Sequence, residues 1–240
     1  MDSNPSIIEE CQTWYSSGRP MERYFRQNGN LHGEYKLWYE NGNLWKHTFY
    51  RDGKEEGQYK SWHENGQLWA QEFYKNGQLE GRSQWWYYNG RPYSEQFYRN
   101  IIADGEHKFW YENGQPMKQM FYRCGKLEGV YKKWSETGML KEKILFRNGK
   151  REKFRSWEQD GKPRLQKSYV NGKVEGEQKY WNYHPRKFET YNYQIGSHNY
   201  KFSLKIKKVF LKMKQCSHCR LFLNIDRMMI PDLLKIAGNL

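Results

Sequence analysis

The chain has 240 residues, of which 41 are Lys or Arg and 27 are Asp or Glu, so its formal net charge is +14. Hydrophobic residues make up 37% of the chain, below the ~45–50% of ordinary globular domains, which argues against a large aliphatic core. Aromatic residues make up 18%, far more than disordered chains carry, so we expect a folded protein in which rings replace aliphatic side chains.

The N-terminal residues 1–10 have neither a basic start nor an apolar stretch, so no signal peptide is predicted. No apolar run in the chain approaches the ~20 residues that a membrane-spanning helix needs. The four cysteines are too few and too scattered for a disulfide framework, which favours a reducing compartment. We therefore expect a cytoplasmic protein, or one of the host cytoplasm if it is viral. We also expect residues 1–13 to form an N-terminal cap.

A repeat of 24 residues occupies most of the chain. Tryptophan recurs at this spacing, with one residue lost between positions 148 and 157, and the column consists of Trp14, Trp38, Trp62, Trp86, Trp110, Trp134, Trp157 and Trp181. Glycine follows the same period in three columns, the first of which includes Gly42, Gly66, Gly90, Gly114 and Gly138. This self-similarity predicts a repeat array over residues 14–196, in which each unit packs on its neighbours.

Each unit contains two aromatic-rich segments bounded by Asn-Gly or Asp-Gly pairs, the strongest short-range signal for a β-hairpin. In one unit we predict strands over 34–40 and 43–51, a two-residue turn at Asn41-Gly42 and a longer return loop over 52–57. Side-chain alternation then assigns residues to two faces. These are Trp38, Trp45 and Phe49 on one face, and Tyr35, Tyr39, Leu44 and Tyr50 on the other.

Both predicted faces are part aromatic and part charged, so neither can serve as a closed interior. We therefore predict an all-β fold, an elongated single-layer antiparallel meander of repeated β-hairpins of about 24 residues, in which each hairpin stacks its rings on the next. A short helical C-terminal tail follows the array. Unpaired sheet edges of such a meander could join two copies into an oligomer.

The recurrent pattern (Asn or Asp)-Gly-x-Leu-x-Gly-x-Tyr-x-x-Trp-x-x-Asn-Gly-x-Leu resembles the MORN repeat family. It is most similar to the MORN-variant repeats of bacterial antitoxin-like proteins and of multi-repeat proteins in giant viruses of amoebae. The resemblance covers residues 14–196 and departs from the pattern at Ile101, Lys153 and His184-Pro185. It implies an elongated hairpin array that acts as a scaffold or protein-interaction module, with a lipid-headgroup role proposed for some members.

Residues 197–240 abandon the repeat, and the last 40 of them carry nine Lys or Arg against two Asp. Between Leu204 and Lys214 the apolar residues fall on one helical stripe, which predicts a basic amphipathic helix. We prefer the interpretation that this helix covers the last strand of the array. Such a helix can also lie on an anionic membrane or contact a partner. The lysines available for that contact are Lys205, Lys207, Lys208, Lys212 and Lys214.

Cys216 and Cys219 form a C-x-x-C pair, which is half of the ligand set of a structural zinc site. Because no second pair accompanies them, we predict two ordinary thiols and no metal, and Cys216 and Cys219 stay the only candidate ligands. No phosphate-binding loop and no nucleophile–base signature occurs, so neither a cofactor nor an enzymatic activity is predicted.

Acidic residues recur beside the return-loop glycines, as at Glu56, Glu80, Asp104 and Glu128. A catalytic pair of carboxylates needs two different environments, which a regular column does not provide. The column therefore predicts a solvated edge that pairs with lysines of adjoining strands, in the column of Lys36, Lys60, Lys108, Lys132 and Lys179.

The function predicted from these features is a non-enzymatic repeat scaffold that mediates protein–protein interaction through an extended aromatic and charged sheet surface, because Tyr, Trp and Arg anchor interfaces. One alternative is a peripheral membrane adaptor that binds anionic lipid through the basic tail. A second is nucleic-acid binding, in which the rings would stack on bases, although the mixed-sign charge of the array argues against it. Antitoxin-like neutralisation of a partner protein is a further alternative.

Overall fold

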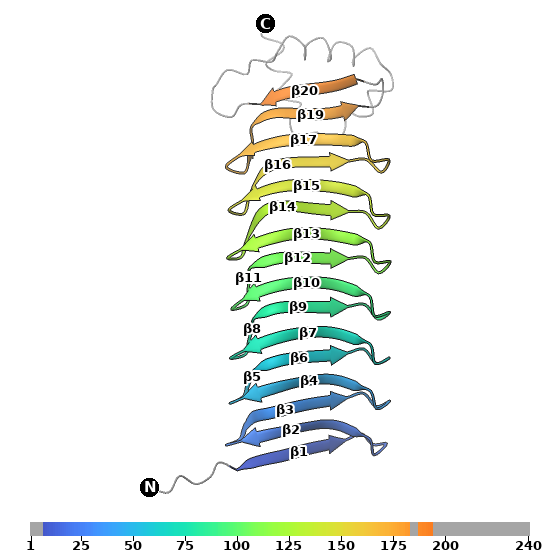
Figure 1. Ribbon diagram of the computed structural model, residues 1–240, viewed down its shortest axis with the longest axis vertical. Helices are drawn as coiled ribbons and strands as arrows, with labels where there is room; N and C mark the ends of the chain where they lie inside the picture. The colour runs from blue at the N-terminus through green and yellow to red at the C-terminus, as the bar shows by residue number, and fades with distance from the viewer. Residues whose placement is uncertain (1–6, 183–186, 194–240) are drawn as a thin grey trace, which may run out of the picture. The chain divides into compact units, whose positions relative to one another are not determined.

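The computed structural model describes residues 7–182 and 187–193, which form one antiparallel β-sheet of 20 strands and contain no helix. From β1 (Ile8–Trp14) to β20 (Lys187–Tyr193) each hairpin arm pairs with the one that follows it in the sequence (Figure 1). The predicted meander of hairpins is confirmed. Three predictions concern segments that lie outside the described residues. These are the helical tail, the departure from the repeat at His184-Pro185 and the two thiols of Cys216 and Cys219.

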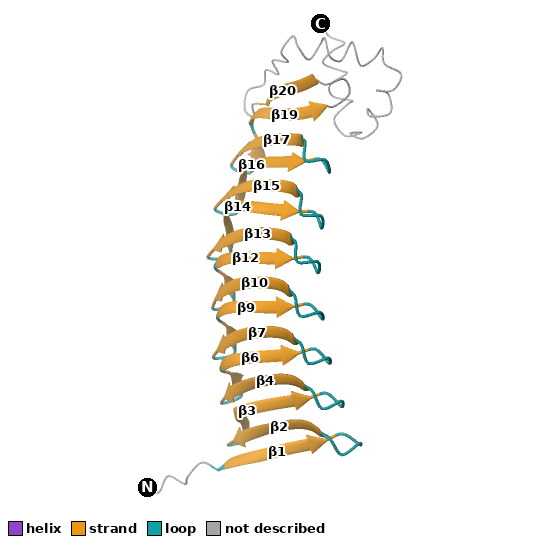
Figure 2. Ribbon diagram, turned by 45° about the vertical axis from the view of Figure 1, so that its right-hand side comes forward, coloured by secondary structure: helices purple, strands orange, loops and turns teal. Residues whose placement is uncertain are grey.

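Two arms form each hairpin, and loops follow one another along both margins of the sheet (Figure 2). The short strands β5, β8, β11 and β18 each precede the main strand of the same arm. The remaining strands are β2 (Pro20–Gln27), β3 (Asn30–Trp38), β4 (Leu44–Arg51), β5 (Lys54–Glu55), β6 (Gly57–Trp62), β7 (Leu68–Lys75), β8 (Gln78–Leu79), β9 (Gly81–Trp86), β10 (Pro92–Arg99), β11 (Ile102–Ala103), β12 (Gly105–Trp110), β13 (Pro116–Arg123), β14 (Lys126–Trp134), β15 (Leu140–Arg147), β16 (Lys150–Trp157), β17 (Pro163–Val170), β18 (Lys173–Val174) and β19 (Gly176–Asn182).

The sheet begins earlier than the repeat pattern predicted. Strand β1 takes up residues 8–14 and pairs with β2 from Ile8 to Trp14. Residues 8–13 of the segment predicted as an N-terminal cap therefore belong to the first strand of the sheet.

The two kinds of turn are the reverse of those predicted. Arg51 pairs with Lys54, so Asp52-Gly53 is a two-residue turn. Both turn residues have positive φ, 50° and 79°, as a type I′ turn requires. The segment predicted as the longer return loop is therefore the tight turn.

The Asn41-Gly42 end is a longer loop of three residues. Tyr39 donates its N–H to the carbonyl oxygen of Asn43 at 2.8 Å and accepts the N–H of Gly42 at 2.9 Å. Gly42 has a φ of 94°, whereas Asn41 has no positive φ. This is a type I turn followed by a left-handed glycine, the usual three-residue hairpin loop, and the predicted two-residue turn is wrong.

The extra loop residue changes which side chains share a face. Trp38 pairs with Leu44 across a register shift, so Trp45 is the additional residue of a bulge. Its ring centroid lies 5.7 Å from that of Tyr39, on the opposite face from Trp38. The prediction that placed Trp45 with Trp38, and Leu44 with Tyr39, is wrong at these two positions.

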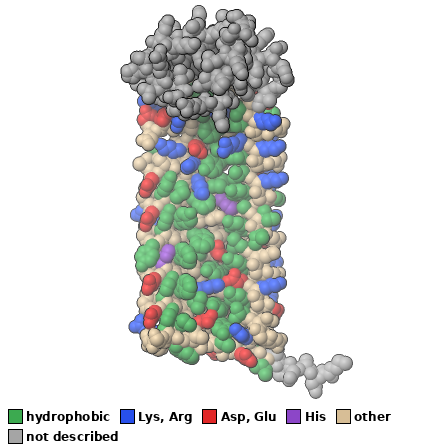
Figure 3. All heavy atoms as spheres, turned by 180° about the vertical axis from the view of Figure 1, so that it is seen from behind, with side chains coloured by type: hydrophobic (Ala, Val, Ile, Leu, Met, Phe, Trp, Pro, Cys, Tyr) green, Lys and Arg blue, Asp and Glu red, His purple; other side chains and the backbone are tan. Residues whose placement is uncertain are grey.

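We call the face that carries Tyr35, Tyr50, Tyr59 and Tyr74 the tyrosine face, and the opposite face the lysine face. Ring pairs on the tyrosine face join the two arms of a hairpin, as between Tyr35 and Tyr50, whose centroids are 5.5 Å apart. Figure 3 shows this face, with hydrophobic side chains over the strands, acidic side chains along the margin of the three-residue loops and basic ones along the other. The buried side chains include Thr48, Ser61, Ser83, Ser94, His107, Met120 and Ile144.

A bulge bends the first arm of each regular hairpin. The arm that follows β4 consists of β5 and β6. Tyr50 pairs with Glu55 and His47 pairs with Lys60, so this arm has two more residues than β4 between the two pairs, and these two have no counterpart. Gly57 lies at this bulge with a φ of 89°. A left-handed residue here explains why the third glycine column exists.

The bulge is one residue shorter in β16. There Arg147 pairs with Lys150 and Leu145 with Lys153, which leaves a single residue without a counterpart. Lys153 has no positive φ. The residue lost from the repeat and the replacement of glycine by Lys153 therefore have one cause, because the shorter bulge no longer needs a left-handed residue.

Hydrogen bonds join successive hairpins along the margin of the three-residue loops. Four tryptophans of the column are followed by a tyrosine that donates its hydroxyl to the carbonyl oxygen of the next tryptophan in the column. The pairs are Tyr15–Trp38 at 2.7 Å, Tyr39–Trp62 at 2.8 Å, Tyr87–Trp110 at 2.8 Å and Tyr111–Trp134 at 2.9 Å. His63 takes the same place in the third hairpin.

The acidic column joins hairpins along the other margin. Its carboxylates accept the backbone N–H of the first residue of the next type I′ turn. The pairs are Glu56–Asn76, Glu80–Asn100, Asp104–Cys124 and Glu128–Asn148, at 2.7–3.2 Å. The predicted pairing with lysines is wrong where it can be compared, because Lys36 bonds to Glu34 and Lys108 to Glu106.

Candidate functional site

A continuous row of mostly polar side chains crosses the middle of the lysine face, with one residue from each main strand. Directly opposed residues in a sheet share a face, and each member of the row is paired with the next. In order, they are Gln12, Arg23, Lys36, His47, Lys60, Gln71, Gln84, Glu95, Lys108, Gln119, Lys132, Lys143, Arg155, Gln166 and Lys179.

In the hairpins up to β13, a carboxylate contacts each basic side chain of this row except Lys60. Glu34 contacts the ammonium of Lys36 at 2.8 Å and Nε2 of His47 at 3.0 Å, and Glu106 contacts Lys108 at 2.6 Å. The lysine hydrogen bond is the main reason why the pKa values of the Glu34 and Glu106 carboxyls lie below their ordinary range.

Two further pairs complete this pattern. Arg23 contacts Glu10 at 2.6 Å, and Arg82 forms an ion pair with Glu95. Positive and negative side chains thus alternate along the first part of the lysine face, which leaves little net charge there.

From β14 to β16 no carboxylate takes part in this pattern. The column of Glu34 and Glu106 also has Gln58 in β6 and Arg82 in β9, continues with Val130 in β14 and Lys153 in β16, and has an acid again at Glu177 in β19. We call Lys132, Lys143, Lys153, Arg155 and Lys179 the basic segment. Among the described residues, the first four of these form no ion pair.

The basic segment places like charges directly opposite each other. Lys132 pairs with Lys143, which pairs in turn with Arg155. Opposed like charges destabilise a sheet, and neighbouring strands lie only ~4.8 Å apart. This arrangement costs stability in the isolated sheet, and an anionic ligand would offset that cost.

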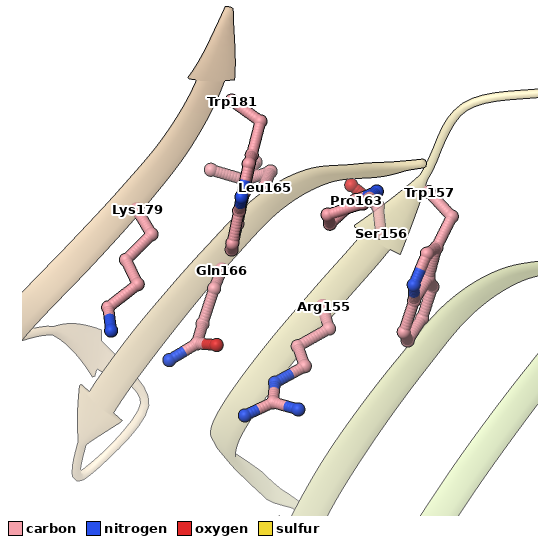
Figure 4. Close-up of a pocket in the computed structure, with 8 residues that line it drawn as sticks. All are labelled: Arg155, Ser156, Trp157, Pro163, Leu165, Gln166, Lys179 and Trp181. Atoms are coloured by element: carbon pink, nitrogen blue, oxygen red, sulfur yellow. The ribbon is translucent and has the colours of Figure 1, made fainter. Parts of the chain in front are cut away.

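A pocket of about 330 Å³ lies at the end of the basic segment, over β16, β17 and β19. In Figure 4 the side chains of Arg155, Gln166 and Lys179 extend to the same side from three neighbouring strands, with Trp157 and Trp181 farther along two of those strands. The other lining residues are Ser156, Pro163 and Leu165.

The tryptophan column runs beside the polar row as a stripe of apolar side chains. From Trp14 to Trp157 each member lies opposite a leucine or a proline, as Trp134 does with Leu140 and Trp157 with Pro163, whereas Trp181 lies opposite Phe188. Trp14, at the first edge, is 57% exposed, and the others are partly buried. The tryptophan column thus has the predicted structural role, and it also forms an accessible apolar stripe beside the basic segment.

The predicted loop glycines all have the left-handed conformation that makes them necessary in the three-residue loops. Their φ values lie between 80° and 94°, and the residues are Gly42, Gly66, Gly90, Gly114 and Gly138. They lie along one margin of the sheet, away from the basic segment.

A polar network on the tyrosine face was not predicted from the sequence. The nearly buried Glu72 accepts hydrogen bonds from the Ser83 and Tyr74 hydroxyls, both at 2.9 Å. Burial, with the neighbouring carboxylate, raises the pKa of Tyr74. These groups satisfy one another, so the network stabilises the sheet and offers no open ligand site.

Lys46 forms a second cluster on the tyrosine face. Its ammonium lies 5.0–5.9 Å from the ring centroids of Tyr35, Tyr50 and Tyr59, and 3.0 Å from Oε1 of Glu55. Burial and Glu55 raise the pKa of Tyr50 to about 12. The cation is already paired, so this cluster is structural as well.

Other predicted site residues cannot be placed. The thiols Cys216 and Cys219 and the tail lysines Lys205, Lys207, Lys208, Lys212 and Lys214 lie outside the described residues. Within the described part of the chain, no group of three or more His, Cys, Asp or Glu could hold a metal ion. The same residues include no helix with the length and apolar character of a membrane span.

Among solved structures, a crystal structure of the GtfA/B complex bound to UDP and GlcNAc is similar over 57% of this chain and 26% of that chain, at 11% identity. This chain thus spans about a quarter of that protein, and with a TM-score of 0.23 the similarity carries no argument. No curated protein matches.

The family described as the MORN repeat variant matches five consecutive segments, residues 31–52, 55–76, 79–100, 103–123 and 127–148. Each segment corresponds to one period of the hairpin array. MORN repeats are a non-enzymatic repeat type whose proteins generally mediate protein or membrane interactions. Residues 31–148 of this chain thus consist of five repeats of the MORN repeat variant family.

Proposed function

We propose that this protein is a non-enzymatic scaffold that binds a protein partner along its extended sheet. Support comes from the MORN repeats and from rings that a single-layer sheet leaves in solvent. On the lysine face, Phe49, Phe73 and Phe121 are 40–47% exposed at equivalent positions of three hairpins. Contiguous exposed apolar side chains mark interaction surfaces, and aromatic residues are the usual anchors of protein interfaces.

The spacing of these rings favours a partner that contacts several hairpins at once. Equivalent residues of neighbouring hairpins are two strands apart, which is roughly 9.6 Å. A partner that engages successive hairpins adds weak contacts together, and the combined affinity exceeds that of any one contact. An extended array therefore suits a long interface better than a small ligand.

The acidic column supports a non-enzymatic role. Its carboxylates hold the backbone of the next turn, as Glu56 does at 2.8 Å from the N–H of Asn76. A carboxylate used in this way accepts a structural hydrogen bond. The regular column therefore gives no support for a general acid or general base.

The test is affinity capture with the full-length tagged chain from its native lysate, with chemical cross-linking to locate the contacts. We expect the variant Phe49→Gln/Phe73→Gln/Phe121→Gln to lose at least about tenfold of the captured partner, because three exposed anchors are removed. Its thermal unfolding midpoint should stay close to that of the parent.

The matched control replaces three apolar side chains that are at least as exposed and lie outside the phenylalanine column, Tyr88→Gln/Ile102→Gln/Val170→Gln. This control should capture the partner as the parent does. Capture of no protein by the parent above background would contradict a scaffold role, and equal losses in both variants would show that the phenylalanine column is not the contact surface.

A further inference from the structure

The charge of the lysine face changes abruptly along the sheet. Up to β13 the row of cations is interleaved with Glu10, Glu34, Glu95 and Glu106, and from β14 to β16 its cations follow one another without interleaved acids. We infer that the basic segment binds an acidic amphipathic helix of a protein partner. This inference rests on the proposed scaffold function and gives it a site and a chemistry.

The change in charge is built into the backbone at Lys153. The shorter bulge of β16 removes the need for glycine and brings Lys153 into direct register between Leu145 and Ser168. A cation is thereby added to the lysine face at a place where earlier hairpins have Glu34, Gln58, Arg82 and Glu106, and where Arg82 alone is a cation, paired with Glu95. The same column has Val130 one hairpin earlier, so the basic segment loses acids and gains a base.

The geometry of the row fits the side of a helix. Its cations lie on successive strands ~4.8 Å apart. Glutamates at positions i, i+3 and i+4 of a helix are ~5–6 Å apart, whereas same-face residues of an extended strand are ~6.6 Å apart. From β14 to β19 the row crosses four strand spacings, roughly 19 Å, the length of a helix of about 13 residues.

The apolar stripe beside the basic segment specifies the second face of the partner. Trp134, Trp157 and Trp181 run parallel to the row, two residues farther along their strands. Leu140 and Pro163 lie opposite the first two of these. Aliphatic neighbours make this a continuous apolar stripe and not a set of open stacking platforms, which favours aliphatic side chains over nucleic-acid bases.

The chain's own C-terminal segment is not complementary to the basic segment. Residues 201–240 carry nine Lys or Arg against two Asp. Two strongly basic surfaces repel each other, so the occupant has to come from another molecule.

The test is fluorescence anisotropy with a labelled model helix that carries a stripe of Glu beside a stripe of Leu on an alanine background. Parent protein should bind this peptide, and more weakly as salt is raised. Lys132→Gln/Lys143→Gln/Arg155→Gln should weaken binding about tenfold. A peptide with Gln in place of each Glu should bind at least about tenfold more weakly to the parent.

Two variants make the test specific. The control Lys36→Gln/Lys60→Gln/Lys108→Gln removes three lysines from the first part of the same row, two of which Glu34 and Glu106 neutralise, and should change the affinity less than about twofold. Val130→Glu keeps every cation and introduces the acid that Glu34 and Glu106 provide at this position in two earlier hairpins. It should weaken binding severalfold, and because Val130 is exposed the fold should tolerate it.

Several results would overturn the inference. These are equal losses in the two lysine variants, equal binding of the Gln peptide, or failure of the parent to bind the Glu peptide. A different occupant would be identified if the parent did not bind the peptide but bound oligouridylate or phosphatidylserine vesicles through these residues. Self-association that the basic-segment variant abolishes, again without peptide binding, would have the same meaning. If a partner is captured equally by the parent and this variant, the site is wrong and the scaffold function stands.

Discussion

The hairpins up to β13 and those from β14 to β19 share one backbone plan but use their faces differently. In the first region the tyrosine face holds hydrogen-bonded polar groups such as Glu72 and Ser83, and the lysine face is neutralised by ion pairs. In the second region, buried Ile144 and Phe146 replace polar groups on the tyrosine face, and cations gather on the other.

This comparison shows which parts of the repeat are free to vary. The turns, bulges and marginal hydrogen bonds involve few side chains and recur along the sheet, so they maintain the fold. The central residues of each strand contact only near neighbours, so either face can change its chemistry by substitution alone, as at Val130, or together with a local change of bulge, as at Lys153. Function in this protein is therefore expected where a face departs from the repeat.

The largest expected effect comes from placing a side chain in the longer bulge of the first region. Gly105 has a φ of 125°, and an added Cβ would lie 3.0 Å from Cβ of Phe97. Gly105→Ala should lower the free energy of unfolding by about 3 kcal/mol in urea denaturation, from strain and overpacking together. Lys153→Gly in the shorter bulge should cost about 1 kcal/mol or less. Similar losses in both would mean that the two bulges are not different.

A smaller effect is expected at an irregular turn within the first region. Ile101 occupies a type I′ turn with a φ of 63°, where equivalent turns have glycine. Ile101→Gly should raise the free energy of unfolding by about 1 kcal/mol, because a β-branched residue is strained there. The reciprocal change Gly77→Ile should lower it by a similar amount, and a stabilising Gly77→Ile would refute the explanation.

The tyrosine ladder distinguishes the two regions more weakly. Tyr111→Phe removes the hydroxyl that bonds the carbonyl oxygen of Trp134 and should cost about 1 kcal/mol of stability. In the next hairpin the equivalent residue is Ser135, whose hydroxyl contacts Thr137 in its own loop. Ser135→Ala should therefore cost less than Tyr111→Phe in thermal unfolding, and the reverse order would mean that the ladder does not join the hairpins.

The smallest expected effect is a difference in pH dependence. His107 is buried on the tyrosine face, and desolvation lowers its pKa below 6.5. The unfolded chain therefore binds the proton more readily, and the parent loses stability as pH falls below about 6.5. His107→Tyr introduces the residue of the equivalent positions 59 and 131. Urea denaturation at several pH values should give a flatter curve for this variant, and parallel curves would contradict the assignment.

The fold was predictable because its signals are local and repeated. Rings and Asn-Gly pairs that recur every 24 residues indicate hairpins regardless of the side chains between them. The assignment of the turns was not predictable from Asn-Gly alone, since the pair serves both kinds. The side chain of the asparagine distinguishes the two kinds of turn. In the three-residue loop Oδ1 of Asn41 accepts the N–H of Asn43 at 2.9 Å. The first position of a type I′ turn is occupied in one hairpin by Cys124, which has no amide side chain.

The basic segment could not be predicted from a sum of charges along the sequence. Lys132, Lys143 and Arg155 are 11 or 12 residues apart in the sequence and become neighbours only through strand register. A sum over the array also includes Lys36 and Lys108, which glutamates neutralise. Counting charge by column of the repeat would have revealed it. The role of the acidic column depends on a backbone partner 20 residues away, for which sequence holds no direct signal.

The side-chain bonds that join one hairpin to the next connect residues only 20 to 23 positions apart. Every new hairpin can thus dock on the one completed before it, without waiting for distant parts of the polypeptide. Short loop closures favour rapid assembly, and synthesis on the ribosome delivers the units in the required order. The sheet is therefore suited to growing from β1 while translation continues, with each finished strand serving as the template for the next.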